Sequence, residues 1–231
     1  WFKLVKPKFL IVECYYDMKM QAIYAAKKLG ITVIELQHGI INKRTFAYYC
    51  RKNFSVNPYP DWLLSYGDMS KEEIKDGKVY EEDKIIPIGS YYLTIMEERK
   101  AVNKKLFYDK YNIISGKKII VVASQVTVDR RLYEITNEIA GKLNGFAVIF
   151  VPRIVEEYHK SNEKTDFYIE DKLDIYQLMQ NADVTISVYS TCAVESLFLG
   201  TPVLLWDIEG LAKACYGEVF KGINSVCFID K

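Results

Sequence analysis

A short segment rich in hydroxyl groups offers the clearest chemistry in the chain. A strand predicted over Val184 to Val188 runs into Ser190 and Thr191 at the start of a predicted helix, and Glu195 follows one helical turn later. The unpaired amides of a first helical turn, the helix dipole and two hydroxyls can together bind a phosphate. A carboxylate one turn further along the same face can accept hydrogen bonds from a ribose diol. The segment therefore predicts a nucleotide site; the alternative is that Ser190 only caps the helix.

A second candidate is the pair His38 and Gly39, which directly follows a strand predicted over Ile31 to Leu36. A histidine in this place can act as a general base on an acceptor hydroxyl, or as a cation that stabilises a leaving phosphate. Gly39 lets the backbone turn and approach a ligand closely. The alternative is that His38 is a hydrogen-bonded structural group.

The elements that must position these residues follow an α/β pattern. Apolar runs of five or six residues alternate with helical periodicities, which is typical of repeated β-α units and a parallel sheet. Strands are expected at 9–13, 31–36, 62–67, 85–88, 118–123, 146–151, 184–188 and 202–206. Helices are expected at 17–29, 129–143, 174–182 and 191–199, with Gly30 ending the first, and a short helix would use Ser70 and Glu73 as a capping box. Ligands of such sheets bind beyond the carboxyl ends of the strands.

The segments resemble the bacterial surface-polysaccharide (capsule and O-antigen) glycosyltransferases and the related CDP-glycerol glycerophosphotransferases. The matching residues are Asp183 to Ser187, Tyr189-Ser190-Thr191, Glu195, Gly200 to Val203, and residues 25–39 with Gln37-His38-Gly39. The resemblance implies a GT-B architecture of two Rossmann-like domains. It implies that Ser190 and Thr191 lie at the donor phosphates, within a donor segment that includes Ser187 and Tyr189, that Glu195 lies at the ribose, and that His38 and Gly39 face the interdomain cleft.

The resemblance also suggests how the chain divides. Gly89 to Asn112 is charged and aromatic and predicts a connection between domains with one helix in it. Residues 1–90 are expected to be the carboxy-terminal part of an acceptor-side domain that is incomplete relative to the family. Residues 91–231 are expected to form the domain that binds the nucleotide-sugar donor.

A third segment, Val148 to Arg153, both supports the resemblance and departs from it. The related families have a His-Pro pair after this strand, and Val151 replaces the histidine here. Arg153 is retained and can contact a diphosphate through its guanidinium fork, unless it is only an exposed loop charge. Ser124 and Gln125 follow the first strand of the second half, where related enzymes approach the donor phosphates. His159 lies in a charged stretch and is expected to face solvent.

The amino-acid composition limits which partners, metals and cellular locations are expected. The 31 basic and 30 acidic side chains give no strong overall field, which argues against a nucleic-acid partner. Five scattered cysteines without a CxxC pair and only two histidines give no metal site and indicate reduced thiols. No apolar run of about 20 residues and no signal peptide is present, so a cytoplasmic location is expected. Lysines at 3, 6 and 8 among Trp1, Phe2 and Leu4 leave room for peripheral contact with the inner membrane surface, or form a solvated approach to a strand.

The sequence therefore predicts a metal-independent glycosyltransferase that moves a sugar from a nucleotide sugar to a glycan or lipid-linked acceptor in surface-polysaccharide synthesis. No cofactor is expected, because helix amino ends and basic side chains can hold the phosphates. Three alternatives remain open. They are polyol-phosphate transfer from CDP-glycerol or CDP-ribitol, which Val151 disfavours, a nucleotide-sugar epimerase or hydrolase, and a non-catalytic nucleotide-sugar-binding module.

Overall fold

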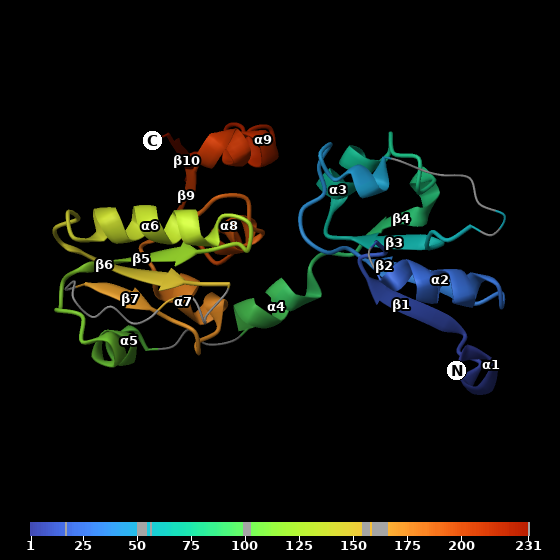
Figure 1. The fold of residues 1–231 in the computed structure, drawn as a ribbon, viewed down its shortest axis with the longest axis horizontal. Helices are drawn as coiled ribbons and strands as arrows, with labels where there is room; N and C mark the ends of the chain where they lie inside the picture. The colour runs from blue at the N-terminus through green and yellow to red at the C-terminus, as the bar shows by residue number, and fades with distance from the viewer. Residues whose placement is uncertain are drawn as a thin grey trace. The chain divides into compact units, whose positions relative to one another are not determined.

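The computed structural model describes residues 1–16, 18–49, 55, 57–98, 103–153, 158 and 166–230. The chain forms two compact units, Trp1–Tyr92 (unit 1) and Leu93–Lys231 (unit 2), and each is built on its own parallel sheet (Figure 1). The predicted α/β class with two Rossmann-like sheets is confirmed.

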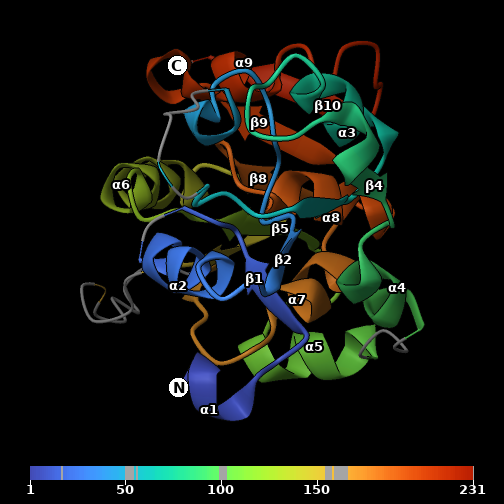
Figure 2. The same ribbon diagram turned by 90° about the vertical axis from the view of Figure 1, so that its right-hand side faces the viewer.

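Unit 1 holds a four-stranded parallel sheet in the order β1-β2-β3-β4, so each strand pairs with the strand that follows it in the chain. The strands are β1 (Phe9–Glu13), β2 (Thr32–Leu36), β3 (Trp62–Ser65) and β4 (Ile85–Pro87). The helical elements are α1 (Phe2–Val5), α2 (Lys19–Lys27), η1 (Phe46–Tyr48), α3 (Asp68–Ile74) and η2 (Glu82–Lys84). Helix α4 (Tyr91–Glu98) contains the boundary between the units. Figure 2 shows α2 beside β1 and β2, with α1 at the amino end of β1.

The two faces of the unit 1 sheet differ in burial. Alternate strand residues point to a core that includes Ile23 of α2 and Ile74 of α3; they are Val12, Val33, Leu63 and Ile85. On the opposite face, Phe9 and Ile11 of β1 remain 57% and 60% exposed. Parallel sheets usually bury both faces, so this exposed apolar face is unusual.

Unit 2 holds a six-stranded parallel sheet in the order β10-β9-β8-β5-β6-β7. The strands are β5 (Lys118–Ala123), β6 (Phe146–Val151), β7 (Phe167–Ile169), β8 (Val184–Ser187), β9 (Val203–Trp206) and β10 (Val226–Ile229). The helical elements are α5 (Lys104–Tyr111), α6 (Asp129–Ala140), α7 (Ile175–Asn181), α8 (Cys192–Phe198), η4 (Ile208–Gly210) and α9 (Leu211–Tyr216). The strand order reverses between β5 and β8, which is the point where doubly wound sheets open a crevice for a ligand.

Both faces of the central strands of unit 2 are buried, which explains why their sequences are continuous apolar runs. Ile119 and Val121 pack on one face against Phe107 of α5 and Leu178 of α7. On the other side, the ring of Tyr133 in α6 stacks edge-on against Phe150 of β6, with centroids 5.5 Å apart.

Several expected elements differ from those observed. The capping box is wrong: Gly67 occupies the N-cap of α3, and Ser70 lies inside the helix and is buried. Gly30 does adopt a left-handed conformation after α2, with φ of 71°. The region from 89 to 112 holds two helices, α4 and α5, where one was expected. Helices α1 and α9 and strands β7 and β10 were not predicted.

Candidate functional site

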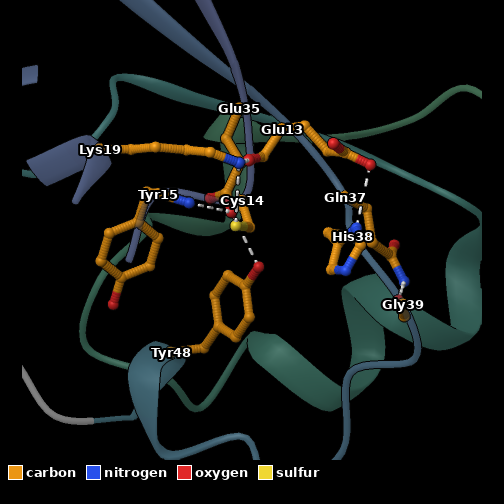
Figure 3. A network of polar contacts seen from close by, with 9 residues as sticks. All are labelled: Glu13, Cys14, Tyr15, Lys19, Glu35, Gln37, His38, Gly39 and Tyr48. Carbon is orange, nitrogen blue, oxygen red and sulfur yellow. Dashed lines mark hydrogen bonds and ion pairs between the residues drawn. The ribbon is translucent and has the colours of Figure 1, made fainter. Parts of the chain in front are cut away.

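The carboxyl ends of β1 and β2 bring Glu13 and His38 together. Glu13 ends β1 and pairs in register with Leu36, and His38 follows two residues later. Nδ1 of His38 lies 2.9 Å from Oε1 of Glu13 (Figure 3). The side chains of His38 and Glu13 are 58% and 65% exposed, so a ligand can reach both. When Nδ1 donates its proton to the carboxylate, Nε2 is left as an acceptor.

A buried glutamine fixes the backbone around His38. The side chain of Gln37, which is 4% exposed, accepts a hydrogen bond from the amide of Tyr66 at 2.7 Å and donates to the carbonyl of Gly39 at 2.8 Å. Its backbone amide donates to the carbonyl of Leu64 at 3.0 Å. Gly39 has a φ of 71°, which favours glycine over any other residue. The loop after β2 is thereby tied to the loop after β3, and His38 is held between two anchored residues.

Glu35 of β2 is fully buried beneath this edge of the sheet. Its Oε1 accepts the backbone amide of Tyr15 at 3.0 Å and the hydroxyl of Tyr48 at 2.9 Å, and its Oε2 accepts the hydroxyl of Tyr80. Burial raises the pKa of Glu35 to about 7, although these hydrogen bonds work in the opposite direction. Burial and the neighbouring carboxylate also raise the pKa values of Tyr48 and Tyr80, so both hydroxyls stay protonated and serve as donors.

The turn after β1 is held from two sides. Lys19 donates to the carbonyl of Glu13, and its Nζ lies 3.4 Å from Sγ of Cys14. Cys14 has a φ of 49°, a left-handed conformation that residues other than glycine rarely adopt. On the far side of Cys14, Glu35 accepts the amide of Tyr15. These contacts fix the turn, and with it the position of the Glu13 carboxylate beside His38.

In unit 2, the carboxyl edge at β5 and β8 is cross-linked by side chains. Oε1 of Gln125 accepts the amide of Tyr189 at 2.8 Å, and the Tyr189 hydroxyl bonds with Thr127. From α9, the Tyr216 hydroxyl donates to the carbonyl of Ser190 at 2.7 Å. The segment that leads into α8 is therefore fixed at the point where the strand order reverses.

The hydroxyls at the start of α8 differ in their availability. Ser190 is 6% exposed, and its Oγ accepts the amide of Cys192 at 3.3 Å. The hydroxyl of Ser190 therefore bonds to a backbone amide of the first turn of α8, although the N-cap residue of this helix is Thr191. Thr191 is half-buried and makes no side-chain capping bond. Of the two hydroxyls, that of Thr191 is the more accessible to a ligand.

Glu195 and Arg153 lie close enough to interact electrostatically. Burial raises the pKa of Glu195, while hydrogen bonds from Tyr176 and Cys192 and the positive charge of Arg153 work in the opposite direction. The backbone amide of Arg153 donates to Asp129 of α6 at 3.0 Å, and its side chain is exposed. An exposed guanidinium on an anchored backbone, near a half-buried carboxylate, is a chemically suitable pair for a phosphate and a ribose.

The remaining predicted donor residues are buried. Ser187 is fully buried, and its hydroxyl donates to the carbonyl of Ala123 at 3.2 Å. Ser124 is 2% exposed, and within the described residues its hydroxyl has no hydrogen-bond partner. His159 and Cys50 lie outside the described residues. In the same described part of the chain, no three His, Cys, Asp or Glu side chains gather as metal ligands, and no helix is long and apolar enough to cross a membrane.

Sequence reasoning missed Glu13 and Glu35. Glu13 directly follows an apolar run, so its place at the carboxyl end of a strand could be predicted. Its pairing with His38 could not, because that depends on the register of β1 and β2. Glu35 has the same strand parity as the buried Val33, which was the available signal that it faces the core.

The sequence of the chain was compared with protein families and with curated proteins. No protein-family model matches the chain. The uncharacterized protein MJ1062 of Methanocaldococcus jannaschii is 24% identical over 233 residues, which cover 96% of this chain and 45% of that protein. The chain therefore spans less than half the length of this relative.

Several solved structures have a fold similar to that of this chain. The UDP-GlcNAc 2-epimerase of Neisseria meningitidis bound to UDP-GlcNAc has a TM-score of 0.68 at 17% identity, over 88% of this chain and 60% of that one. The UDP-GlcNAc 2-epimerase of M. jannaschii has a TM-score of 0.62 at 16% identity, over 99% and 68%. The wall teichoic acid polymerase TagF has a TM-score of 0.58 at 16% identity, over 87% and 53%.

The chain has a GT-B-type fold. Two of these similar structures are nucleotide-sugar epimerases and the third is a polymerase, so the fold is shared by proteins that carry out different reactions. A choice among reactions must therefore come from the side chains at the carboxyl edges of the two sheets.

Proposed function

We propose that the protein transfers a sugar from a nucleotide sugar to a glycan or lipid-linked acceptor in cell-surface polysaccharide synthesis, without a metal ion. The observation that carries this proposal is the exposed pair of His38 and Glu13, with 2.9 Å between Nδ1 and Oε1. Direct attack of an acceptor hydroxyl on the anomeric carbon is assisted by a base, and a histidine oriented by a carboxylate is suited to that task.

In the proposed reaction, Nε2 of His38 accepts the proton of the acceptor hydroxyl. The hydroxyl oxygen then forms a bond to the anomeric carbon of the sugar, and the bond from that carbon to the phosphate oxygen breaks. The electron pair leaves with the nucleotide, and the negative charge of Glu13 stabilises the imidazolium that forms. The Gln37 contacts hold the backbone on both sides of His38 during this step, and Glu13 orients the ring.

Unit 2 supplies the groups for the donor. In this proposal, the guanidinium of Arg153 neutralises charge on the donor phosphates, and the hydroxyl of Thr191 donates to a phosphate oxygen. Glu195 accepts hydrogen bonds from the ribose hydroxyls. The raised pKa of Glu195 fits a half-buried carboxylate that gains hydrogen-bond donors when the ligand arrives.

A two-stage experiment tests the proposal. Thermal-shift assays against CMP, CDP, UDP, GDP and their sugars identify the nucleotide, because a ligand that binds only the folded state raises its apparent stability. Glu195→Ala should remove that shift. His38→Ala should keep the shift and lower turnover by about 100-fold or more, as expected for loss of a general base.

Product analysis with the same nucleotide sugar separates the possible reactions. Sugar joined to an added acceptor supports the proposal. Free sugar formed in water alone identifies a hydrolase, an isomerised nucleotide sugar identifies an epimerase, and binding without turnover identifies a binding module. Any of these three outcomes rejects transfer as the function.

A further inference from the structure

The turn after β1 contains a residue in an unfavourable backbone conformation. Cys14 has a φ of 49°, which residues other than glycine rarely adopt. Such a conformation persists only where neighbouring contacts hold it in place. The preceding residue is Glu13, whose carboxylate lies 2.9 Å from Nδ1 of His38. The contacts that hold Cys14 therefore also decide how the chain leaves β1 at Glu13.

Lys19 of α2 holds this turn from the solvent side. Its ammonium group donates to the carbonyl of Glu13, and its Nζ lies 3.4 Å from Sγ of Cys14. Figure 3 shows the extended side chain of Lys19 ending at the turn. A carbonyl that accepts such a bond resists rotation, so the peptide between Glu13 and Cys14 keeps its orientation.

Glu35 of β2 holds the same turn from the core. Its Oε1 accepts the amide of Tyr15 at 3.0 Å and the hydroxyl of Tyr48 at 2.9 Å, and its Oε2 accepts the hydroxyl of Tyr80. An amide can only donate, and both hydroxyls stay protonated because burial and Glu35 raise their pKa values. Accepting at both oxygens is the role of an ionised carboxylate.

Lys19 and Glu35 also act on each other. The positive charge of Lys19 favours the ionised form of Glu35 and lowers its pKa, against the larger effect of burial. We call these two residues the turn clamp. The other titratable groups around Glu35 are the thiol of Cys14 and the phenols of Tyr15, Tyr16, Tyr48, Tyr59 and Tyr80.

The charge of Glu35 does not stabilise unit 1. Burial raises the pKa of Glu35 to about 7, so stability falls as the pH rises toward 7 and the carboxyl group ionises. A glutamine would fill the same space and keep an acceptor for the amide of Tyr15 without this cost. A buried charge that lowers stability is typical of residues that serve function.

We propose that the turn clamp, with Glu35 ionised, positions Glu13 so that its carboxylate orients His38. Both clamp residues act through the turn, and Glu35 is fully buried and cannot contact a substrate. The inference rests on the proposed function in one respect, that His38 is the base for the acceptor hydroxyl. When Glu35 takes up a proton, its attraction to Lys19 is lost and one of its oxygens becomes a donor. The turn is then held less tightly, and transfer slows.

The ring of His38 reports on the turn clamp without any substrate. A hydrogen bond to Glu13 favours the tautomer that carries its proton on Nδ1, and ¹⁵N NMR spectra distinguish the two tautomers of a neutral imidazole. The chain has two histidines, so a His159→Gln background leaves the signals of His38 alone. Spectra are recorded at about pH 9, where imidazoles are neutral.

Two clamp variants and one control are compared in this way. Glu35→Gln and Lys19→Met should each shift His38 toward the tautomer with its proton on Nε2. Val33→Ala removes buried volume from the same face of β2 and should give the wild-type spectrum. Lys19 is exposed, so Lys19→Met keeps the test valid even if Glu35→Gln does not fold.

Turnover with the nucleotide sugar found by thermal shift gives a second readout. Glu35→Gln should lower kcat about 10-fold and leave KM nearly unchanged, because the base is misplaced rather than removed. It should do so at pH 8, where this variant is the more stable protein. In the wild type both His38 and Glu35 must lose a proton, so log kcat should fall at low pH with a limiting slope of about two, and Glu35→Gln should show a slope of about one.

The outcomes separate the turn clamp from the proposed reaction. Spectra of both clamp variants that match Val33→Ala would overturn the proposal, and so would a wild-type ring without a proton on Nδ1. A limiting slope of about one in the wild type would overturn the part played by the charge of Glu35. A shifted tautomer with unchanged transfer would support the turn clamp and reject His38 as the base, so that failure belongs to the proposed function alone.

Discussion

Glu35→Gln is expected to remove most of the pH dependence of unit 1 stability. Glu35 is fully buried, and burial raises its pKa from the ordinary 4.5 to about 7. A group whose pKa is raised in the folded state holds its proton more tightly there than in the unfolded chain. For a carboxylic acid, this means that stability is highest below pH 4.5, falls between pH 4.5 and 7, and is lowest above pH 7.

The size of the effect follows from the difference between the two pKa values. Each pKa unit corresponds to about 1.4 kcal/mol, so the wild type should lose about 3 kcal/mol of unfolding free energy between pH 4.5 and 8. Glutamine keeps an oxygen acceptor for the amide of Tyr15 and does not ionise. Its unfolding free energy should be nearly constant over the same range, and at pH 8 the difference from the wild type should be largest.

Urea unfolding followed by tryptophan fluorescence measures this effect. In a Trp206→Phe background the signal comes from Trp1 and Trp62, both in unit 1. Glu81→Gln, at an exposed position, serves as the control for loss of one negative charge. Parallel pH curves for wild type and Glu35→Gln would refute the reasoning, because they would show that Glu35 titrates no differently in the folded and unfolded chain.

Further predictions concern both units. Although burial works in the opposite direction, hydrogen bonds from Lys110, Tyr111 and the amides of Lys172 and Leu173 lower the pKa of Glu170 to about 2. The stability that Glu170 gives unit 2 should therefore be present above pH 4.5 and lost as the pH falls toward 2. Glu170→Gln should cost about 2 kcal/mol at pH 7 and little at pH 2, and equal losses at both values in urea unfolding would contradict this. Tyr216→Phe removes the donor to the carbonyl of Ser190 and should cost about 1 kcal/mol. It should also weaken the thermal shift by nucleotide, and an unchanged shift would mean that this contact does not shape the donor site. Gly39→Ala forces a side chain onto a φ of 71° and should cost about 1 kcal/mol. Its turnover should fall more than that of Gly30→Ala, which has the same φ at the opposite edge of the sheet, and an equal fall would separate Gly39 from the chemistry.

The central strands of unit 2 could be predicted because both of their faces are buried. The segments Lys118–Ala123 and Phe146–Val151 match the predicted strands to the residue, since buried parallel strands are continuous apolar runs with polar residues at their ends. The helices of unit 2 were predicted two or three residues too long, because helix ends depend on local capping contacts rather than on periodicity.

The hydrogen bonds between side chains could not be predicted from the sequence in this way. Glu35 bonds to residues 15, 48 and 80, which come from the loop after β1, from η1 and from the loop after α3, and no local pattern links them. The prediction of His38 as a candidate rested on its place after a strand, and the structure adds its partner, Glu13, from the neighbouring strand. A position at a strand end is a local property, whereas a partner is fixed only when the strands pair.

The different strand orders of the two sheets affect how the chain can fold during its synthesis. In unit 1 every strand pairs with its predecessor, so the sheet can grow strand by strand as the chain leaves the ribosome. In unit 2, β5 pairs first with β6, and its other edge stays open until β8 has been made. The 64 residues that separate Ile119 from Asp183, at the starts of these strands, take several seconds to synthesise at about 5–20 residues per second. During that interval β5 exposes an apolar edge to other chains, so substitutions that delay the docking of β8 should reduce soluble yield more than their cost in equilibrium stability would suggest.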